Sequence, residues 1–415
     1  MDKPQKPFLP FLLGSDENVY SFARAFHERY GIKPAVLCKK QYIPTKYSKI
    51  IELYIIEGFD SETVFTEALS RIAGEKLAEY EKLLLVPCSD RYVELTVNNP
   101  EVIGRYFANR FITPEQLEKF VTKERFYALC EEYGQRYPKT FVCEYENRTA
   151  APELMREAGI DFPVVVKPAN SNSYEYLNSS FEGKKKVFFI DSRGEYDALI
   201  ANMAVSDYRG VLIIQERIAG DDTNERTMNC FSDANGEVVM MSLGCSVLQE
   251  YAPLRMGNYA AILSSNDEIL YERIRAFLNE IKYVGFSNFD MKYDARTGEY
   301  VLFEINPRQG CSNFFSFAAG CDLAKLLVDV YVNNETPPLV KAGSEILWSS
   351  VPKGILLKYV KNPEILAKVK ALIKQKKFHM TLYYKKDFSV RRYMRIFLYY
   401  LRHYRSFKRY FFDKK

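Results

Sequence analysis

The segment VLFEINPRQGCSNFF, residues 301–315, is the most informative stretch of this chain because polar residues follow an apolar run in a regular order. An apolar run reaches Glu304, and Asn306 and Arg308 follow at intervals of two residues. Side chains alternate between the two faces of a strand, so the acid and the amide lie on the same face. Packing does not explain an acid, an amide and an arginine at the end of an apolar strand. The segment therefore predicts a functional site at this strand end.

A second strand completes an acidic group around this strand end. Residues 285–294 and 299–306 read as two strands joined by a short turn, which predicts a β-hairpin that places Asp290 near Glu304. Mg²⁺ prefers carboxylate and carbonyl oxygens together with substrate phosphates, and the guanidinium of Arg308 suits a phosphate or a carboxylate. The alternative is that each acid is a solvated edge-strand residue paired with the arginine. We predict a magnesium site formed by Asp290, Glu304 and Asn306.

Two lysines point to an anionic ligand. Lys167 ends the apolar strand FPVVV at residues 162–166, where packing does not explain a cation. Lys123 begins a predicted helix, although the positive end of the helix dipole favours acids there. The alternative for both is an ordinary surface lysine. A specific anionic partner is therefore the functional interpretation of both lysines.

A third strand end offers backbone groups for an adenine ring. The strand GVLII, residues 210–214, runs into a polar stretch that closes with an apolar residue. Taken alone this pattern is weak, because many strands end in the same way. The candidate nucleotide-binding residues are Gln215, Glu216, Arg217 and Ile218.

Composition excludes several other classes of protein. The chain has 415 residues, 47% of them hydrophobic, which is enough for two or more folded domains. Its eight cysteines include no Cys-x-x-Cys pair and there are only three histidines, so neither a zinc site nor a disulfide framework is expected. P-loop and G-x-G-x-x-G motifs are absent, and no catalytic triad is supported. No apolar stretch approaches the ~20 residues of a membrane-spanning helix. A reducing cytoplasm fits these features best.

The order of predicted elements suggests four segments. Strand-like and helix-like stretches alternate over the first hundred residues, which predicts a doubly wound parallel sheet. A mostly helical stretch follows, and strands then return. The predicted fold class is α/β (α+β). The segments are an N-terminal α/β domain at 1–112, two further subdomains at 113–208 and 209–340, and a basic aromatic extension at 341–415.

The C-terminal extension carries the positive charge of the chain. Residues 341–415 contain 20 lysines and arginines and 4 acids, whereas the rest of the chain is acidic on balance. Three interpretations remain open at this point: a solvated basic helix packed on the core, a segment that contacts an anionic membrane surface, and a nucleic-acid-binding segment. No nucleic-acid-binding module accompanies the charge, so nucleic acid is not expected as a partner.

The order of these features resembles the ATP-grasp superfamily, and several longer stretches resemble the bacterial peptidoglycan D-aspartate ligases. The stretches are LLGSDENVYSFARAF, PTKYSKI, VVVKPANSNSYEYL, FEGKKKVFFID, QERIAGDD, GFSNFDMKYD and GEYVLFEINPRQG. The resemblance implies an ATP-grasp fold preceded by an N-terminal α/β domain, with ATP and Mg²⁺, or Mn²⁺ in its place, as cofactors. It further implies that D-aspartate is phosphorylated on its side-chain carboxylate and that a lysine amine of a muramyl-peptide precursor attacks the acyl phosphate. The enzyme would then work in the cytoplasm, including at the inner face of the membrane.

The resemblance also assigns roles to residues. Lys123 and Lys167 would contact the phosphates, and Arg308 would stabilise the transferred phosphoryl group, with Lys167 and Arg308 as catalytic residues. The phosphate-covering loop of the family is usually rich in glycine, but residues 169–177 contain none. Ser171 and Ser173 are the candidate contacts there, and residues 169–184 are the candidate lid. Ser15, Asp16, Asn18 and Arg255 are candidates for contacts with the amino acid or the acceptor, although Ser15 and Asp16 equally suit a helix cap.

Three functions are compatible with the sequence. The first is a D-aspartate ligase that acts on a peptidoglycan precursor. The second is a ligase of the same mechanism for another amino acid or acceptor. The third is a catalytically silent nucleotide-binding protein at a membrane surface.

Overall fold

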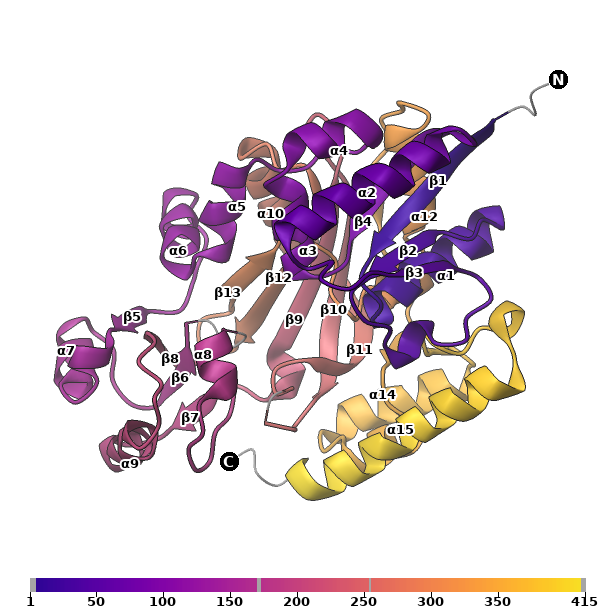
Figure 1. The fold of residues 1–415 in the computed structure, drawn as a ribbon. Helices are drawn as coiled ribbons and strands as arrows, with labels where there is room; N and C mark the ends of the chain where they lie inside the picture. The colour runs from indigo at the N-terminus through magenta and orange to yellow at the C-terminus, as the bar shows by residue number, and fades with distance from the viewer. Residues whose placement is uncertain (1–4, 170–172, 254, 412–415) are drawn as a thin grey trace.

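The N-terminal region forms a parallel sheet with helices on both faces. In the computed structural model, which describes residues 5–169, 173–253 and 255–411, its strand order is β3-β2-β1-β4. The strands are β1 (Lys6–Leu13), β2 (Ala35–Cys38), β3 (Glu52–Ile55) and β4 (Tyr80–Pro87). They are connected by α1 (Glu17–Tyr30), η1 (Ile43–Thr45) and α2 (Glu62–Leu77), and α3 (Asp90–Val97) and α4 (Pro100–Tyr106) follow (Figure 1).

Alternation along β1 explains why helices cover both faces of this sheet. Phe8 and Leu12 belong to the core that includes α1, whereas Leu9, Phe11 and Leu13 belong to the core that includes α2. Side chains that alternate along one strand must be buried on opposite faces, so the strand needs a helix on each. The predicted doubly wound parallel sheet is therefore confirmed.

A small antiparallel sheet follows, and it stands apart from the N-terminal sheet (Figure 1). Its order is β5-β8-β6-β7. The strands are β5 (Thr140–Cys143), β6 (Val164–Pro168), β7 (Phe188–Ile190) and β8 (Leu212–Glu216), and the helices around them are η2 (Tyr145–Asn147), α7 (Ala151–Glu157), α8 (Tyr174–Asn178) and α9 (Arg193–Ala204). Helices α5 (Pro114–Val121) and α6 (Lys123–Glu132) precede this sheet in the chain but pack on the core of the large sheet. Strand β5 lies within the stretch predicted to be mostly helical, because four residues are too few to show a strand period.

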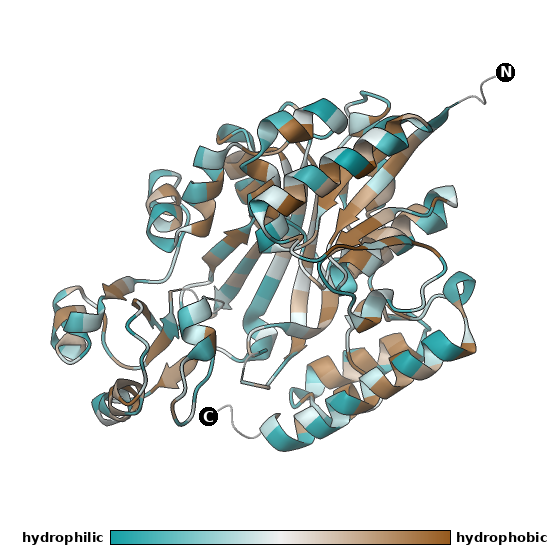
Figure 2. Ribbon diagram, in the orientation of Figure 1, coloured by the Kyte–Doolittle hydropathy of each residue, from teal (hydrophilic) through white to brown (hydrophobic). Residues whose placement is uncertain are grey.

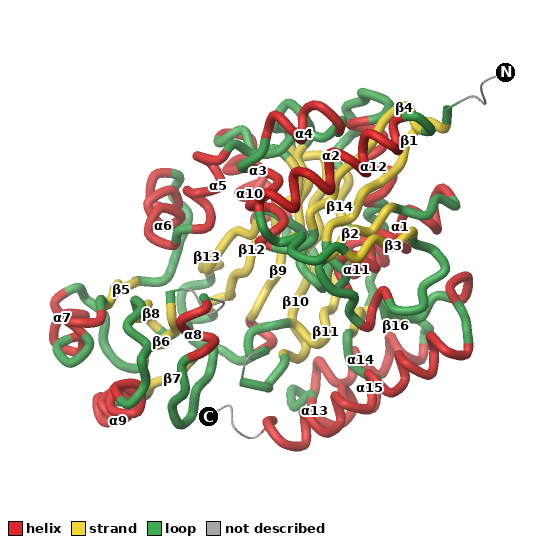
Figure 3. Tube along the Cα trace, in the orientation of Figure 1, coloured by secondary structure: helices red, strands yellow, loops and turns green. Residues whose placement is uncertain are grey.

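The largest sheet has the order β13-β12-β9-β10-β11-β15-β16, and β14 pairs with β10. Figure 3 shows its long strands running through the middle of the molecule. The strands are β9 (Glu225–Ser232), β10 (Val238–Gln249), β11 (Tyr259–Ser265), β12 (Gly285–Asp294), β13 (Glu299–Asn306), β14 (Val340–Lys341), β15 (Leu347–Ser349) and β16 (Phe378–His379). The associated helices are η3 (Asp222–Asn224), α10 (Glu268–Glu280), α11 (Phe314–Ala318) and α12 (Leu323–Tyr331). The predicted β12–β13 hairpin is confirmed, whereas β11 was not predicted.

The C-terminal segment is helical and packs against the rest of the protein (Figure 1). It contains α13 (Lys353–Tyr359), α14 (Pro363–Lys374), η4 (Lys385–Asp387) and α15 (Val390–Tyr410). Among the described residues, no helix combines the length and the apolar character needed to span a bilayer. Figure 2 shows hydrophobic and hydrophilic residues interleaved along α15.

The sheets do not follow the four predicted segments at two points. Strand β8 comes after residue 208 but lies between β5 and β6 in the small sheet. Strands β15 and β16 come after residue 340 but extend the large sheet. The sheet to which each of these strands belongs depends on pairing with segments distant in sequence, and local composition does not predict such pairing.

Candidate active site

The two acids predicted to act together lie directly opposite each other. In the β12–β13 hairpin Asp290 pairs with Glu304, and a β-bulge follows between Asp290 and Met291. Asn306 Nδ2 lies 3.3 Å from Asp290 Oδ2 and 3.4 Å from Glu304 Oε1. The hairpin thus brings all three predicted metal ligands together.

The chemistry of these three side chains fits Mg²⁺. The amide of Asn306 already bridges the two carboxylates, and rotation of that amide by 180° would put its oxygen where its nitrogen now lies. Within the described residues, no group of three or more His, Cys, Asp or Glu side chains could hold a metal on its own. An ion at this hairpin would therefore depend on the amide, on water and on substrate oxygens, which is the usual environment of Mg²⁺.

Electrostatics separate the two acids. Burial and the neighbouring charge of Glu304 raise the pKa of Asp290, although the hydroxyl of Tyr259 donates a hydrogen bond of 2.9 Å to its carboxylate. The ammonium of Lys123, 3.2 Å away, holds the pKa of Glu304 below its usual value. A cation bound between the acids would offset the burial and the repulsion that raise the pKa of Asp290.

The two predicted lysines lie beside the acids. Lys123 is the first residue of α6, and the attraction of Glu304 raises its pKa although burial alone would lower it. Lys167 projects from β6, and burial together with the charge of Lys123 lowers its pKa to about 7. Two cations this close repel each other without an anion between them. The pair is therefore suited to bind phosphate.

The residues predicted to line the adenine site mostly contact other parts of the protein. The side-chain amide of Gln215 donates to Tyr127 Oη and to Thr140 Oγ1, both at 2.7 Å. The carboxylate of Glu216 accepts a bond of 3.0 Å from the backbone N–H of Lys139, Arg217 pairs with Asp191 at 2.6 Å, and Ile218 is buried. In this arrangement Gln215 braces β8 against α6.

Arg308 lies between the hairpin and the N-terminal domain. Its guanidinium makes a bidentate pair with Asp90, at 2.5 and 3.0 Å. Asp90 is the first residue of α3, and its side chain is 62% exposed. Because the partner carboxylate is solvated, an incoming phosphate can compete for the arginine without leaving a buried charge unpaired.

The remaining candidates have local roles in this structure. Ser173 accepts a bond from Tyr176 N and caps α8, whereas Ser171 lies outside the described residues. Asp16 caps α1 by accepting from Val19 N at 3.2 Å. Ser15 donates to Lys40 O at 2.6 Å.

The two further candidates for substrate contacts, Asn18 and Arg255, differ in their exposure. The buried Asn18 donates to Gln309 O at 2.7 Å and so holds the chain that follows β13. Arg255 pairs with the buried Glu250 at 3.2 Å, and its own side chain is 48% exposed. Only Arg255 thus presents a charged group that solvent can reach.

Sequence reasoning missed two tyrosines of the site. Tyr259 opens the unpredicted strand β11 and contacts Asp290. Tyr127 lies one helical turn after Lys123 and joins Gln215 to the backbone oxygen of Phe303, to which it donates at 3.1 Å. The spacing of four residues after Lys123 was the only available signal for Tyr127, and Tyr259 had none.

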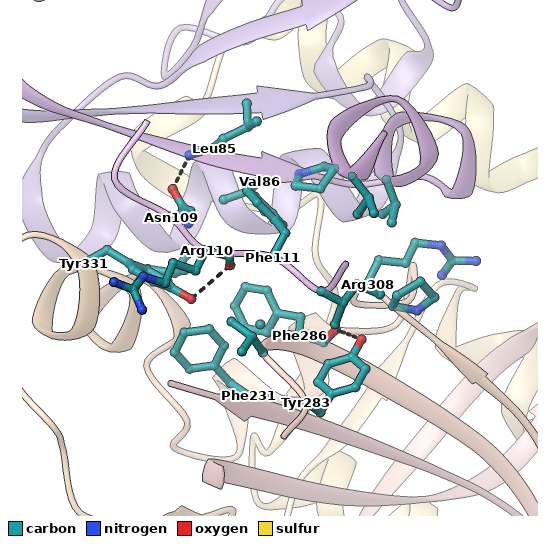
Figure 4. Close-up of a pocket in the computed structure, with 18 residues that line it drawn as sticks. Leu85, Val86, Asn109, Arg110, Phe111, Phe231, Tyr283, Phe286, Arg308 and Tyr331 are labelled. Atoms are coloured by element: carbon teal, nitrogen blue, oxygen red, sulfur yellow. Dashed lines mark hydrogen bonds between the residues drawn. The ribbon is translucent and has the colours of Figure 1, made fainter. Parts of the chain in front are cut away.

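A cavity beside the site is too small for a substrate. It lies between the N-terminal domain and the large sheet and measures about 30 Å³ (Figure 4). Its lining includes Arg308, Phe286 and Tyr331, whose hydroxyl donates to Arg110 O at 3.3 Å. This volume holds about one water molecule. This cavity is therefore not the candidate ligand site.

Comparison with known proteins supplies an independent finding. No protein-family model matches the chain. The chain is 39% identical over 416 residues to the D-aspartate ligase of Enterococcus faecium (strain Aus0004), with 98% of each sequence covered.

Solved structures show the same fold at low sequence identity. N5-carboxyaminoimidazole synthetase from Staphylococcus aureus, complexed with ADP, has a TM-score of 0.58 at 12% identity and covers 88% of this chain and 87% of its own. The biotin carboxylase domain of the Hydrogenobacter thermophilus 2-oxoglutarate carboxylase, in complex with MgADP, ADP and bicarbonate, has a TM-score of 0.57 at 16% identity and covers 79% and 70%. At these identities the likeness establishes the fold.

Proposed function

The chain belongs to the D-aspartate ligase family and has the ATP-grasp fold of a carbon–nitrogen ligase, and from this premise we propose that it activates the β-carboxylate of D-aspartate with ATP and joins it to the lysine ε-amine of a peptidoglycan precursor. Membership of a ligase family argues against the third hypothesis, a catalytically silent nucleotide-binding protein.

The observation that carries the proposal is the convergence of opposite charges at the β12–β13 hairpin. Asp290, Glu304 and Asn306 come from the hairpin, whereas Lys123 and Lys167 come from α6 and β6, which are distant from it in sequence. Oxygen ligands next to paired cations suit a magnesium–triphosphate complex. The relatives with this fold that bind ADP or MgADP support the same interpretation.

The chemistry explains why the site needs both sets of groups. Hydroxide is too poor a leaving group for a carboxylate to acylate an amine, so transfer of the γ-phosphate to the carboxylate must come first. When bound, Mg²⁺, or Mn²⁺ in its place, would neutralise charge on the phosphates. Lys123 and Lys167 would hold the phosphate oxygens in line, and Arg308 would leave Asp90 to contact the transferred group.

The site must also exclude water, because an acyl phosphate hydrolyses readily. We propose residues 169–184 as the cover. Part of it is the short helix α8, and just beyond it the backbone of Lys186 donates to Pro253 O at 3.1 Å. This bond links the cover to the loop that carries Arg255. We propose that Arg255 meets a carboxylate of the amino acid or of the acceptor peptide.

The cysteines support a cytoplasmic location for this activity. All eight are free thiols, and six are buried. A reducing compartment keeps thiols in this state. We propose that the enzyme meets its muramyl-peptide acceptor in the cytoplasm.

The test is a screen for ADP release over D- and L-amino acids, with and without UDP-muramyl pentapeptide. We expect release that requires D-aspartate and increases with the acceptor, together with a product one aspartyl residue heavier than the acceptor. If another amino acid succeeds where D-aspartate fails, the substrate assignment is wrong and the ligase mechanism stands. If no carboxylate promotes ADP release, the proposed mechanism is wrong as well.

A further inference from the structure

Helix α15 carries an apolar stripe that faces solvent. Its members recur every three or four residues and are 41–73% exposed: Val390, Met394, Phe397, Leu401 and Tyr404. Leu398, also on α15, is 47% exposed, and Phe388, just before the helix, is 51% exposed. A stripe with this period lies along one side of a helix. Solvent-exposed apolar residues in such a continuous row mark an interaction surface.

Another side of the same helix is fixed to the protein body. Buried positions recur along it as well: Arg392, Ile396, Tyr400, His403 and Phe407. The guanidinium of Arg392 is fully buried, pairs with Asp387 at 2.9 Å and donates to Lys46 O and Pro44 O at 2.8 and 2.9 Å. These contacts fix the orientation of the helix about its own axis. The exposed stripe therefore cannot turn inward to pack on its own chain.

Cations line one side of the stripe. Six exposed lysines and arginines lie on α15, and none of them forms an ion pair within the described residues: Arg391, Arg395, Arg402, Arg405, Lys408 and Arg409. Residues 388–411 contain no aspartate or glutamate. Elsewhere on the protein surface, exposed arginines commonly have acidic partners, as Arg71 has Glu75 and Arg193 has Asp197. An uncompensated row of cations favours binding to an anionic partner.

We propose that α15 docks on an anionic lipid surface, with its axis parallel to the membrane plane. The apolar stripe would enter the boundary between headgroups and acyl chains, and the adjoining cations would contact lipid phosphates. A second copy of the chain is the competing occupant of an apolar helix face. Antiparallel packing of two such helices through their stripes would bring the two cation rows to the same side without any acid, and like charges at that distance repel.

The docking would place the rest of the enzyme close to the membrane without inserting it. The stripe belongs to a helix whose other side reaches the N-terminal domain through Pro44 and Lys46. The enzyme body would therefore keep a fixed orientation on the lipid surface. This inference concerns where the protein binds, and it holds whether or not the proposed substrate is correct.

The test is flotation of the full-length protein with vesicles of phosphatidylcholine alone or with 30% phosphatidylglycerol. We expect binding to the anionic vesicles that is at least tenfold tighter than to the neutral ones, and that weakens as the salt concentration rises from 50 to 500 mM. Phe397→Ser/Leu401→Ser should weaken binding at least tenfold. The matched control is Val205→Ser/Ile269→Ser, which replaces apolar residues that are 80% and 85% exposed elsewhere.

The charge contribution needs its own pair of variants. Arg402→Gln/Arg405→Gln should weaken binding to anionic vesicles more than tenfold, at about 5-fold per charge. Lys33→Gln/Lys40→Gln removes two exposed cations from the N-terminal domain and should leave binding unchanged.

Three outcomes would overturn the proposal. The first is no binding to anionic vesicles at 50 mM salt. The second is equal loss of binding in the stripe variant and its control. The third is a dimer, measured by light scattering, that the stripe variant dissociates, because the stripe would then be an interface between two copies. ADP release with soluble substrates should be the same in every folded variant, and circular dichroism checks the folding.

Discussion

The carboxylates of Asp290 and Glu304 lie opposite each other across one antiparallel hairpin, and a single amide, that of Asn306, lies within 3.4 Å of an oxygen of each. Two acids at such close range raise the free energy of the protein unless a cation joins them. The arrangement therefore costs stability in the absence of metal. Such a loss of stability is expected in an enzyme site and not in a hairpin with a purely structural role.

The first prediction concerns Glu304. Glu304→Gln removes one proposed metal ligand and the partner of Lys123, while the volume of the side chain stays the same. We expect the rate of ADP release to fall about 10²–10³-fold and the melting temperature to change little. Glu299→Gln is the matched control on the same strand, where the acid pairs with Arg136 at 2.6 Å. Activity close to wild type in Glu304→Gln would show that the metal assignment is wrong.

The second prediction concerns the stability associated with Asp290. Its pKa is raised in the folded protein, so the folded state binds a proton more tightly than the unfolded state does. The free energy of unfolding therefore falls as the pH rises above 4, the region where the unfolded carboxyl ionises. Asp290→Asn has no carboxyl to ionise, so it should not show this fall in the free energy of unfolding.

We expect metal-free Asp290→Asn to unfold with a free energy about 1 kcal/mol higher than wild type at pH 8, and the difference to vanish near pH 4. Urea denaturation with a chelator present measures both. The same variant should lose Mg²⁺-dependent ADP release. A variant that is less stable than wild type at pH 8 would contradict the inferred repulsion between the two acids.

The third prediction concerns proton uptake by Lys167. Its pKa of about 7 leaves the amine mostly uncharged at pH 8 in the nucleotide-free protein. Contact with phosphate oxygens should raise that pKa and charge the amine. Binding of ATP at pH 8 should therefore take up a proton, whereas at pH 6 it should not.

Titration calorimetry in two buffers of different ionisation enthalpy measures this uptake. Lys167→Met should abolish it and weaken ATP binding, whereas Lys139→Met, a change at a lysine outside the charge cluster, should keep it. Equal uptake in wild type and Lys167→Met would assign the proton to another group.

The fourth prediction concerns the buried pair that anchors α15. Arg392 and Asp387 are both fully buried, and Asp387 also accepts from Tyr20 Oη at 2.8 Å. Arg392→Met leaves a buried carboxylate without its charged partner, and we expect a loss of about 3 kcal/mol in the free energy of unfolding. Arg392→Met/Asp387→Asn removes both charges and should recover part of this loss. No difference between the single and the double variant in urea unfolding would contradict the coupling.

The sequence alone indicated a substantial part of the fold and the site. The strand–helix alternation at the N-terminus and the 285–306 hairpin could both be read because each depends on a local period. Glu304 and Asn306 could be placed on one face for the same reason. The sequence did not show β5 and β11, because β5 is short and the sequence around β11 has no distinctive pattern.

Contacts between segments distant in sequence could not be predicted from the sequence. Tyr259 reaches Asp290, Asp90 reaches Arg308 and Tyr127 reaches Gln215 through the folding of separate elements onto one another. The four predicted segments likewise missed that β8 and β15 belong to sheets built mainly from other segments.

The sequence by itself determined which chemical groups are present and which of them share a strand or a helix, because periodicity is a property of local backbone geometry. Only the tertiary structure decided that Lys123 and Lys167 face Glu304, and that one side of α15 is buried while its apolar stripe stays in solvent. The physical reason is the same in both cases. Burial and electrostatic pairing depend on distances through space, and a linear order of residues does not specify those distances.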